Sequence, residues 1–368
     1  MRPSFQESQL KQLGLLIESG SGVAHIAPAL SAFLCKLVGA EAGGLSWFSE
    51  SGTPEGFYQR GSTREAELLF MNRYEELFSG PDEYTPFWSL RNKGDGIIHT
   101  GQASQSYLRS NTFNLLVKPS HCHFLLCVLV TLNGVPRLSV CFFREVKNPF
   151  SEADAHRVTA LIPLLRSAVG KQANALAACG NSHSESGFLL VSRDGERIEM
   201  IDEAATGLLT TVKLFHQNIS AISELLAPPR FIQQLCEQLR QQNMPSAQTT
   251  IDLAGGALVV TAKWLNQASE PNCQAHDIAP DTAPVSKVLV ELYFRRSRAN
   301  EVVQIISGMS LSPLQGRIAM YAAKGGSRIE CAAHHQVSSE ALKKHLREIY
   351  AASSCADWHE LAATLRSV

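Results

Sequence analysis

The sequence predicts a multidomain α+β protein, and three observations support this prediction. The 368 residues with 45% hydrophobic content are enough for two or three globular units. Residues 1–178 and 187–298 each mix helical and strand patterns, whereas residues 305–368 carry almost only helical ones. The stretches between these three segments are polar or rich in small residues, so we expect domain boundaries there.

The composition indicates a cytoplasmic protein. The formal net charge is −1, so any surface that binds nucleic acid must be local and small. The nine cysteines are scattered and form no CxxC motif, which is typical of reduced thiols and not of a disulfide framework. The N-terminus lacks the pattern of a signal peptide, and the longest apolar run, 124–132, is about half of what a membrane span needs.

In the first segment, a helix is predicted over residues 23–38, where apolar residues recur at helical spacing up to Gly39. Residues 43–49 and 56–62 are expected to form short strands around a Gly/Pro turn. A further helix is predicted over 65–78. These elements alternate in the way that α/β domains do.

A β-hairpin and a long helix complete the first segment. Asn133-Gly134 joins two apolar runs and suits a type I′ turn. The helix is expected to start at the N-cap Ser151 and to continue through Arg166 to Ala178. Leu161, Leu164, Leu165, Val169 and Leu176 lie on or near one stripe of that helix, so we expect its later part, near Leu176, to form a dimer contact, and packing of the stripe on the sheet of the first segment is the alternative.

The second segment predicts a sheet with short helices. Strands are expected at 187–192 and 197–202, around the turn 193–195, and later at 249–253, 257–265 and 287–296. A helical stretch begins at Glu203, and the Pro/Asn/Asp-rich residues 266–286 are expected to form a loop. This order of elements defines an α/β module separate from the first.

The third segment contains three helix starts in about thirty residues. Ser312 with Gln315, and Ser327 with Glu330, form the capping-box pattern, and Ser338 caps the next helix. The last of these helices has an apolar seam and an opposite basic face; the seam consists of Leu342, Leu346 and Ile349, and the face of Lys343, Lys344 and Arg347. Such a helix suits the major groove of DNA, although a solvated basic face is an alternative interpretation.

Residues 311–365 resemble the LuxR-type (GerE-like) helix-turn-helix of bacterial regulators. The resemblance lies in LSP (311–313), AKGGS (323–327), VS (337–338) and KKHLREIY (343–350). It implies a homodimer that binds double-stranded DNA, with the recognition helix over 338–352. The residues that it assigns to DNA contact are Lys343, Lys344, Arg347, Ser338, Ser339 and Arg328.

The chain departs from the LuxR pattern at several positions, and the departures leave an alternative function open. Leu314-Gln315 stands where the family has Arg-Glu, and Arg317 stands where it has an acid. The segment holds seven Lys/Arg residues (317, 324, 328, 343, 344, 347, 366) against five acids (330, 340, 348, 357, 360), so the predicted DNA reader is only weakly basic. A degenerate LuxR-type protein that captures another regulator, as an anti-activator without DNA binding, is the alternative.

The first two segments resemble sensor domains. Residues 8–170 resemble a GAF-like input domain through YLRSNTFNLLVKP (107–119), the two core strands and the helix after 149, and residues 187–298 resemble a PAS domain through their strand order. Such folds hold small ligands against the sheet. The candidate ligand-binding residues are Trp47, Tyr58, Trp88, Tyr107, Phe113, His121 and His123, and plain core packing is the alternative for each aromatic.

Catalysis, metal binding and cofactor binding are not predicted. His121 and His123 lie two apart, but no third ligand accompanies them at a matching spacing, and haem on a single histidine stays open. The GxSxG, Walker A, HExxH and GGDEF-like motifs are absent, although a sensor enzyme with an unrecognised site is a second rival. We therefore expect a cytoplasmic, homodimeric transcriptional regulator that responds to a small molecule.

Overall fold

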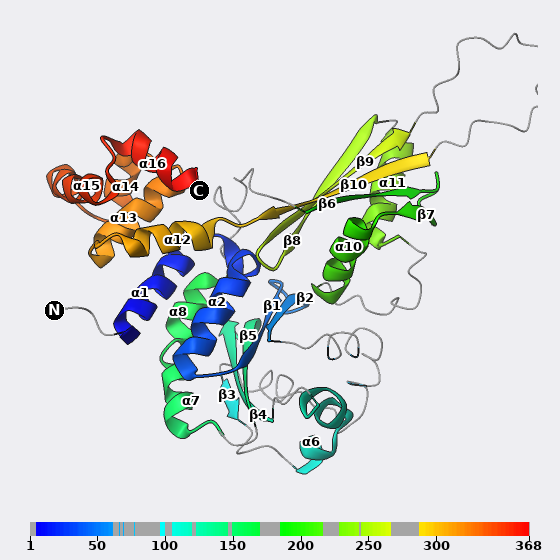
Figure 1. Cartoon of the computed structure of the whole chain (residues 1–368), viewed down its shortest axis with the longest axis horizontal. Helices are drawn as coiled ribbons and strands as arrows, with labels where there is room; N and C mark the ends of the chain where they lie inside the picture. The colour runs from blue at the N-terminus through cyan, green and yellow to red at the C-terminus, as the bar shows by residue number, and fades with distance from the viewer. Residues whose placement is uncertain are drawn as a thin grey trace, which may run out of the picture.

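The computed structural model describes residues 5–61, 66, 69, 77, 96–99, 105–119, 123–145, 149–169, 185–215, 228–242, 244–265 and 287–367. These residues form two five-stranded antiparallel sheets, each with helices beside it, and a C-terminal helical region (Figure 1). The expected multidomain mixture of helices and strands is therefore confirmed at this level. None of the described helices is both long and apolar enough to cross a membrane.

The first sheet has the strand order β2-β1-β5-β4-β3. Its strands are β1 (Ala42–Phe48), β2 (Pro54–Arg60), β3 (Gly96–His99), β4 (Phe124–Leu132) and β5 (Val135–Arg144). The turn between β4 and β5 is the predicted one, with Asn133 at φ 53° and Gly134 at φ 77°. The expected hairpin and both expected short strands are confirmed.

Helices lie on both faces of the first sheet. One face packs against α2 (Gly22–Val38), α7 (Glu152–Thr159) and α8 (Ile162–Ala168), and α1 (Phe5–Glu18) packs on α2 and α8. Helix α6 (Gln105–Arg109) lies across the sheet from them, followed by the π-helix η2 (Thr112–Val117) (Figure 1). Alternation along β4 sends Leu126, Val128 and Val130 into the large core, whereas Leu125, Cys127 and Leu129 form a separate cluster.

The predicted helix over 23–38 is α2, which ends at Gly39 with φ 63°. Most of the predicted helix over 65–78 lies outside the described residues.

The expected continuous helix from Ser151 through Arg166 is wrong. The chain forms α7, breaks at Ala160 and Leu161, and resumes as α8, which stops at the extended residue Val169. Pro163 lacks the amide hydrogen that a continuous helix needs at this point. Leu161, Leu165 and Val169 are all buried in the core of the first sheet, so this part of the stripe is not free for a dimer contact. Leu176 and the rest of 170–178 lie outside the described residues.

The second sheet repeats the strand order of the first: β7-β6-β10-β9-β8. Its strands are β6 (Ser186–Val191), β7 (Ile198–Ile201), β8 (Ser246–Leu253), β9 (Gly256–Leu265) and β10 (Lys287–Arg296), and one face packs on α10 (Glu203–Phe215) and α11 (Arg230–Gln242). Helix α11 was not among the elements predicted from the sequence. Its signal is the helical spacing of Ile232, Leu235, Cys236 and Leu239, all of which are buried.

The C-terminal helices are α12 (Ala299–Gly308), α13 (Pro313–Ala323), α14 (Arg328–His334), α15 (Ser339–Ser353) and α16 (Trp358–Arg366). The predicted segment 305–368 thus begins inside α12. All three expected caps are present: Ser312 and Ser327 form capping boxes, and the side chain of Ser338 accepts from the amide of Ala341.

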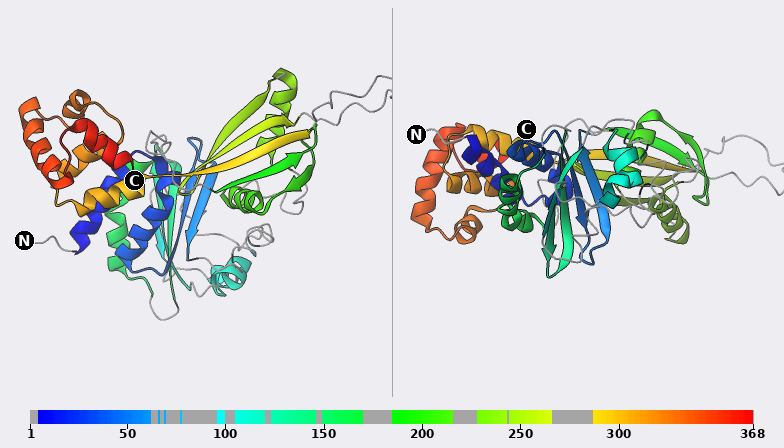
Figure 2. Two further views of the ribbon diagram at one scale, coloured as in Figure 1. Left: turned by 45° about the horizontal axis from the view of Figure 1, so that its top comes forward. Right: turned by 90° about the horizontal axis from the view of Figure 1, so that it is seen from below.

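The three parts of the chain contact one another. Helix α12 follows β10 directly and packs on α1 and α13, so that the helical region shares its apolar core with the first sheet (Figure 2). The second sheet contacts α2 through the amide of Gly255, which donates to the carbonyl of Ala24 at 2.9 Å, and through the hydrogen bond between the His25 ring and the Asp252 carboxylate, also at 2.9 Å. The C-terminal helices are therefore held next to the N-terminal helices.

Candidate nucleic-acid interface

Helix α15 separates an apolar side from a charged side. Leu342, Leu346 and Ile349 are at most 2% exposed and pack into the core, which confirms the predicted inward seam. The predicted outward residues Lys343, Lys344 and Arg347 are all exposed. Because three cations project from consecutive turns of one short helix, this face is sterically able to enter a groove and contact phosphates or base edges.

The other predicted DNA-contact residues surround the start of α14 and α15. Ser338 is the N-cap of α15 and Ser339 is its first residue, and both are exposed. Arg328, the first residue of α14, is also exposed. Burial raises the pKa of Tyr350 on α15, and the charge of Arg328 opposes that rise, which places Arg328 beside α15. All six predicted residues are therefore exposed, on α15 or at the start of α14.

An acidic side chain reduces the positive charge of this face. The carboxylate of Glu340 contacts the ammonium group of Lys343 at 2.6 Å. The hydrogen bond and charge of Lys343, followed by the charge of Arg347, lower the pKa of Glu340. Glu340 is thus ionised at neutral pH and competes with any phosphate for Lys343. The contact of Glu340 with Lys343 was not predicted, although the two residues are three apart on one predicted helix.

Buried polar contacts fix the orientation of α15. The side-chain amide of Gln315, which is 5% exposed, donates to the carboxylate of Glu348, and its carbonyl oxygen accepts from the amide of Ser312 at 2.8 Å. The indole of Trp358 on α16 donates to the carbonyl of Gly326 at 3.1 Å. Gln315, one of the departures from the LuxR pattern, therefore has a structural role here: it links α13 to α15.

Helix α1 binds the other side of the helical region. Lys324 donates to the carbonyl of Glu18 at 3.0 Å, and the Arg317 guanidinium lies 3.9 Å from the Glu18 carboxylate. Lys11 donates to the carbonyl of Leu311. A cavity of about 260 Å³ lies at this junction, lined by Glu18, Gly20, Arg317, Met320, Tyr321, Lys324, His334 and His335. Burial and the neighbouring cations lower the pKa of His335 to about 4, so this histidine is neutral at pH 7.

The candidate ligand residues of the first sheet do not converge on one place. Trp47 and Tyr58 both pack into the large core with α2, and Trp47 lies flat on Gly56, where a Cβ would be 2.2 Å from its ring. Tyr107 and Phe113 belong to α6 and η2, with ring centroids 5.6 Å apart. Burial and the nearby thiols of Cys141 and Cys127 raise the pKa of Tyr107. Because these two thiols lie on the face of the sheet away from the large core, Tyr107 lies on the side opposite to Trp47 and Tyr58.

The histidine candidates and Trp88 provide less evidence of a ligand-binding site. His123 directly precedes β4 and is half-buried, with an Nδ1 atom that is buried without a partner. Trp88 and His121 lie outside the described residues. Within the described ranges, no group of three or more His, Cys, Asp or Glu side chains could hold a metal ion.

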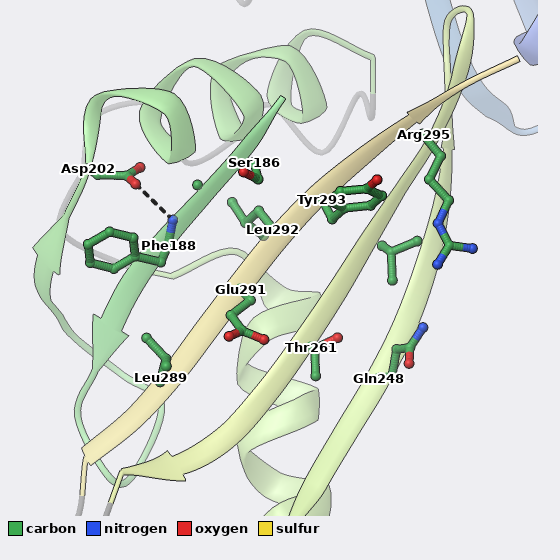
Figure 3. A pocket seen from close by; sticks show the side chains of 12 residues that line it. Ser186, Phe188, Asp202, Gln248, Thr261, Leu289, Glu291, Leu292, Tyr293 and Arg295 are labelled. Atoms are coloured by element: carbon green, nitrogen blue, oxygen red, sulfur yellow. Dashed lines mark hydrogen bonds between the residues drawn. The ribbon is translucent and has the colours of Figure 1, made fainter. Parts of the chain in front are cut away.

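The open face of the second sheet carries a hollow that the sequence analysis missed. It has a volume of about 940 Å³ and is lined mainly by outward residues of β6, β10, β9 and β8 (Figure 3). Phe188 is 42% exposed beside Leu289, while Lys263 and Glu291 form an exposed ion pair at 2.6 Å on the same face. The signal in the sequence was the alternation of apolar and polar residues along 287–296.

The fold and the site define an α+β protein with two sheets of the same strand order and a C-terminal helical unit that presents a basic helix face. No family model and no curated protein matches the chain. Among solved structures, the VqsR LBD domain from Pseudomonas aeruginosa aligns with 44% of this chain and 94% of its own, at 15% identity and a TM-score of 0.30. Similarity at this level defines neither the fold nor the function of the present chain.

Proposed function

We propose that this chain is a homodimeric DNA-binding transcriptional regulator. The observation that supports the proposal best is α15: its inward seam is fully buried, while Lys343, Lys344 and Arg347 are exposed together on the opposite side. In this proposal α15 is the recognition helix of a LuxR-type helix-turn-helix, with α14 as the supporting helix. Two copies are needed because one short helix makes too few base contacts for specific binding.

The two sheet domains serve as sensors in this proposal, the first GAF-like and the second PAS-like, and neither is an enzyme. Their shared strand order supports a common sensor architecture. A small-molecule effector that binds one sheet domain would alter operator binding by favouring one arrangement of the helical region. The contacts of Lys324 and Arg317 with Glu18 give a direct route for such a change, because they join the first domain to α13. The protein acts in the cytoplasm.

The test is selection of binding sites from random double-stranded DNA by the purified full-length protein. We expect an enriched sequence with two related half-sites and an affinity that falls steeply with salt. Arg347→Ala should weaken binding, whereas the matched control Arg240→Ala, an exposed arginine on α11, should not. No enrichment, with both variants equal to the wild type, would contradict the proposal.

A second candidate function has its own supporting observation. Ile329 on α14, the residue after Arg328, is 85% exposed, so the helical region also presents an apolar side chain to solvent. An exposed isoleucine suits a protein interface better than a phosphate backbone. The alternative is an anti-activator that binds another regulator. Ile329→Asp would abolish that binding, but its negative charge would also impair DNA binding. Ile329→Ser removes the apolar side chain without adding a charge, so this variant separates the two functions.

A further inference from the structure

Two cysteines stand directly opposite each other in the centre of the first sheet. Cys127 on β4 pairs with Cys141 on β5, and both are free thiols. Their Sγ atoms are 3.1 Å apart. A disulfide bond is about 2.05 Å long, so a displacement of about 1 Å separates the dithiol from a bond.

Polar groups surround this pair. Ser139, two residues before Cys141 on β5, places its Oγ 3.6 Å from the sulfur of Cys127 and 4.0 Å from that of Cys141. Cys127 is fully buried, whereas Cys141 is only half-buried and therefore closer to solvent. The hydroxyl of Tyr107 lies near both thiols. The pair thus lies beneath α6, on the side of the sheet away from α2.

The thiols influence each other's ionisation. The hydrogen bond between them lowers the pKa of Cys127 and raises the pKa of Cys141 well above the ordinary value. The pair therefore loses its first proton more readily than an isolated buried thiol does. The remaining proton stays on Cys141, so the thiolate forms on Cys127, where the hydrogen bonds from Cys141 and Ser139 stabilise it.

We propose that Cys127 and Cys141 form a redox-active dithiol that a small hydroperoxide converts reversibly into an intramolecular disulfide. The Cys127 thiolate attacks one oxygen of the peroxide and breaks the O–O bond, which yields a sulfenic acid on Cys127 and, after protonation, water or an alcohol. The sulfur of Cys141 then attacks the sulfenic sulfur of Cys127, the S–S bond forms and the S–O bond breaks, and the sulfenic oxygen leaves as water with the proton of the Cys141 thiol. Overall, two thiols are oxidised and one hydroperoxide is reduced.

The other described cysteines are poorer targets. Burial raises the pKa of both Cys236 and Cys331 to about 11, so they stay protonated at neutral pH. Cys35 contacts the hydroxyl of Ser31, and Cys355 contacts the carbonyl of Ser353 and the hydroxyl of Thr364. Only the thiolate reacts with peroxide, and a second sulfur must lie within reach to form a disulfide. Within the described residues, Cys127 and Cys141 combine both conditions.

The experiment treats the reduced full-length protein with hydrogen peroxide at neutral pH. Thiols that remain free are then alkylated under denaturing conditions, and the product is analysed by intact mass and by peptide mapping. We expect two fewer alkylated thiols than in the untreated protein, a peptide that links Cys127 to Cys141, and full recovery of both thiols with dithiothreitol.

Two variants make the result specific. Cys141→Ser should abolish the linked peptide, and Cys236→Ser, which removes an isolated buried thiol, should leave it unchanged. Circular dichroism checks that both variants fold. If Cys141→Ser fails to fold, the wild-type peptide map alone decides. Oxidation of other cysteines without a Cys127–Cys141 peptide, or loss of the thiols that dithiothreitol does not reverse, would overturn the proposal.

Discussion

Glu340 and Lys343 form an ion pair at 2.6 Å on the exposed face of α15, one helical turn apart. This pair places a negative charge beside the cations that are proposed to contact DNA. The pair is a direct physical reason for a modest affinity of the helical region for DNA, because a phosphate that binds Lys343 must displace the Glu340 carboxylate.

Glu340→Gln should therefore strengthen DNA binding. The variant removes one negative charge and releases Lys343, so we expect an affinity gain of about two- to fivefold and a salt dependence steeper by about one unit of slope. Fluorescence anisotropy with selected DNA over a series of salt concentrations measures both quantities. Glu203→Gln, an exposed acid at the start of α10, is the matched control and should have no effect.

Arg347→Ala should weaken binding of the selected site by about 1–3 kcal/mol if Arg347 contacts a guanine, and should relax the base preference opposite it. A lysine that contacts phosphate would behave differently, so Lys344→Ala should weaken the binding of all DNA sequences about equally. Repeating the site selection with both variants distinguishes the two roles. Equal losses on selected and random DNA for Arg347→Ala would assign this residue to the backbone instead.

Leu346→Asp should unfold the helical region. Leu346 is 2% exposed and packs between the helices of this region, where a carboxylate without a partner costs several kcal/mol. We expect loss of helical circular dichroism in the full-length protein together with loss of DNA binding. Lys344→Asp, on the exposed side of the same helix, should keep the fold. If Leu346→Asp retained the wild-type unfolding transition, the orientation of α15 would be wrong.

Local patterns in the sequence predicted the elements well, and long-range contacts account for what they missed. Caps at Ser312, Ser327 and Ser338 and the Asn133-Gly134 turn depend on neighbouring residues only, and all are present. The break at Leu161 was missed because the apolar stripe continues through it in sequence, while Pro163 and burial against the sheet end α7. Trp47 and Tyr107 were expected to line one ligand site, but they lie on opposite faces of the first sheet. The register of the strands determines which face each side chain contacts, and local sequence patterns do not contain this register.

Asp154→Asn should destabilise the first domain. The Arg144 guanidinium lies 3.1 Å from the Asp154 carboxylate, and both side chains are at least nine-tenths buried. Removing the carboxylate leaves a buried charge without its counterion, so we expect a loss of about 3–5 kcal/mol. Chemical denaturation measures this loss, and Glu152→Gln at the exposed start of α7 is the control.

The same residue contributes to acid sensitivity. Burial raises the pKa of Asp154, but the hydrogen bonds from Ser151 and Arg144 outweigh it, and the net shift is below the ordinary value of 3.8. Because the folded-state pKa is lowered, the stabilisation is complete only well above the unfolded-state pKa, at about pH 5 and higher, and is lost as the pH falls from there through the folded value. The wild type should lose more stability than Asp154→Asn between about pH 5 and the folded value. Parallel pH profiles would contradict this assignment.

The contact between Lys324 and Glu18 should control how firmly the helical region binds α1. Lys324 lies at the end of α13 and donates to the carbonyl at the last residue of α1. Lys324→Met keeps the length and apolar stem of the side chain but removes the donor, so the contact at the end of α1 weakens while the core around Leu15 and Gly316 is retained. We expect faster hydrogen exchange in α1 and α13, with unchanged exchange in α11. Lys36→Met, an exposed lysine on α2, is the matched control. Unchanged exchange in both helices would show that the apolar contacts alone hold α1 in place.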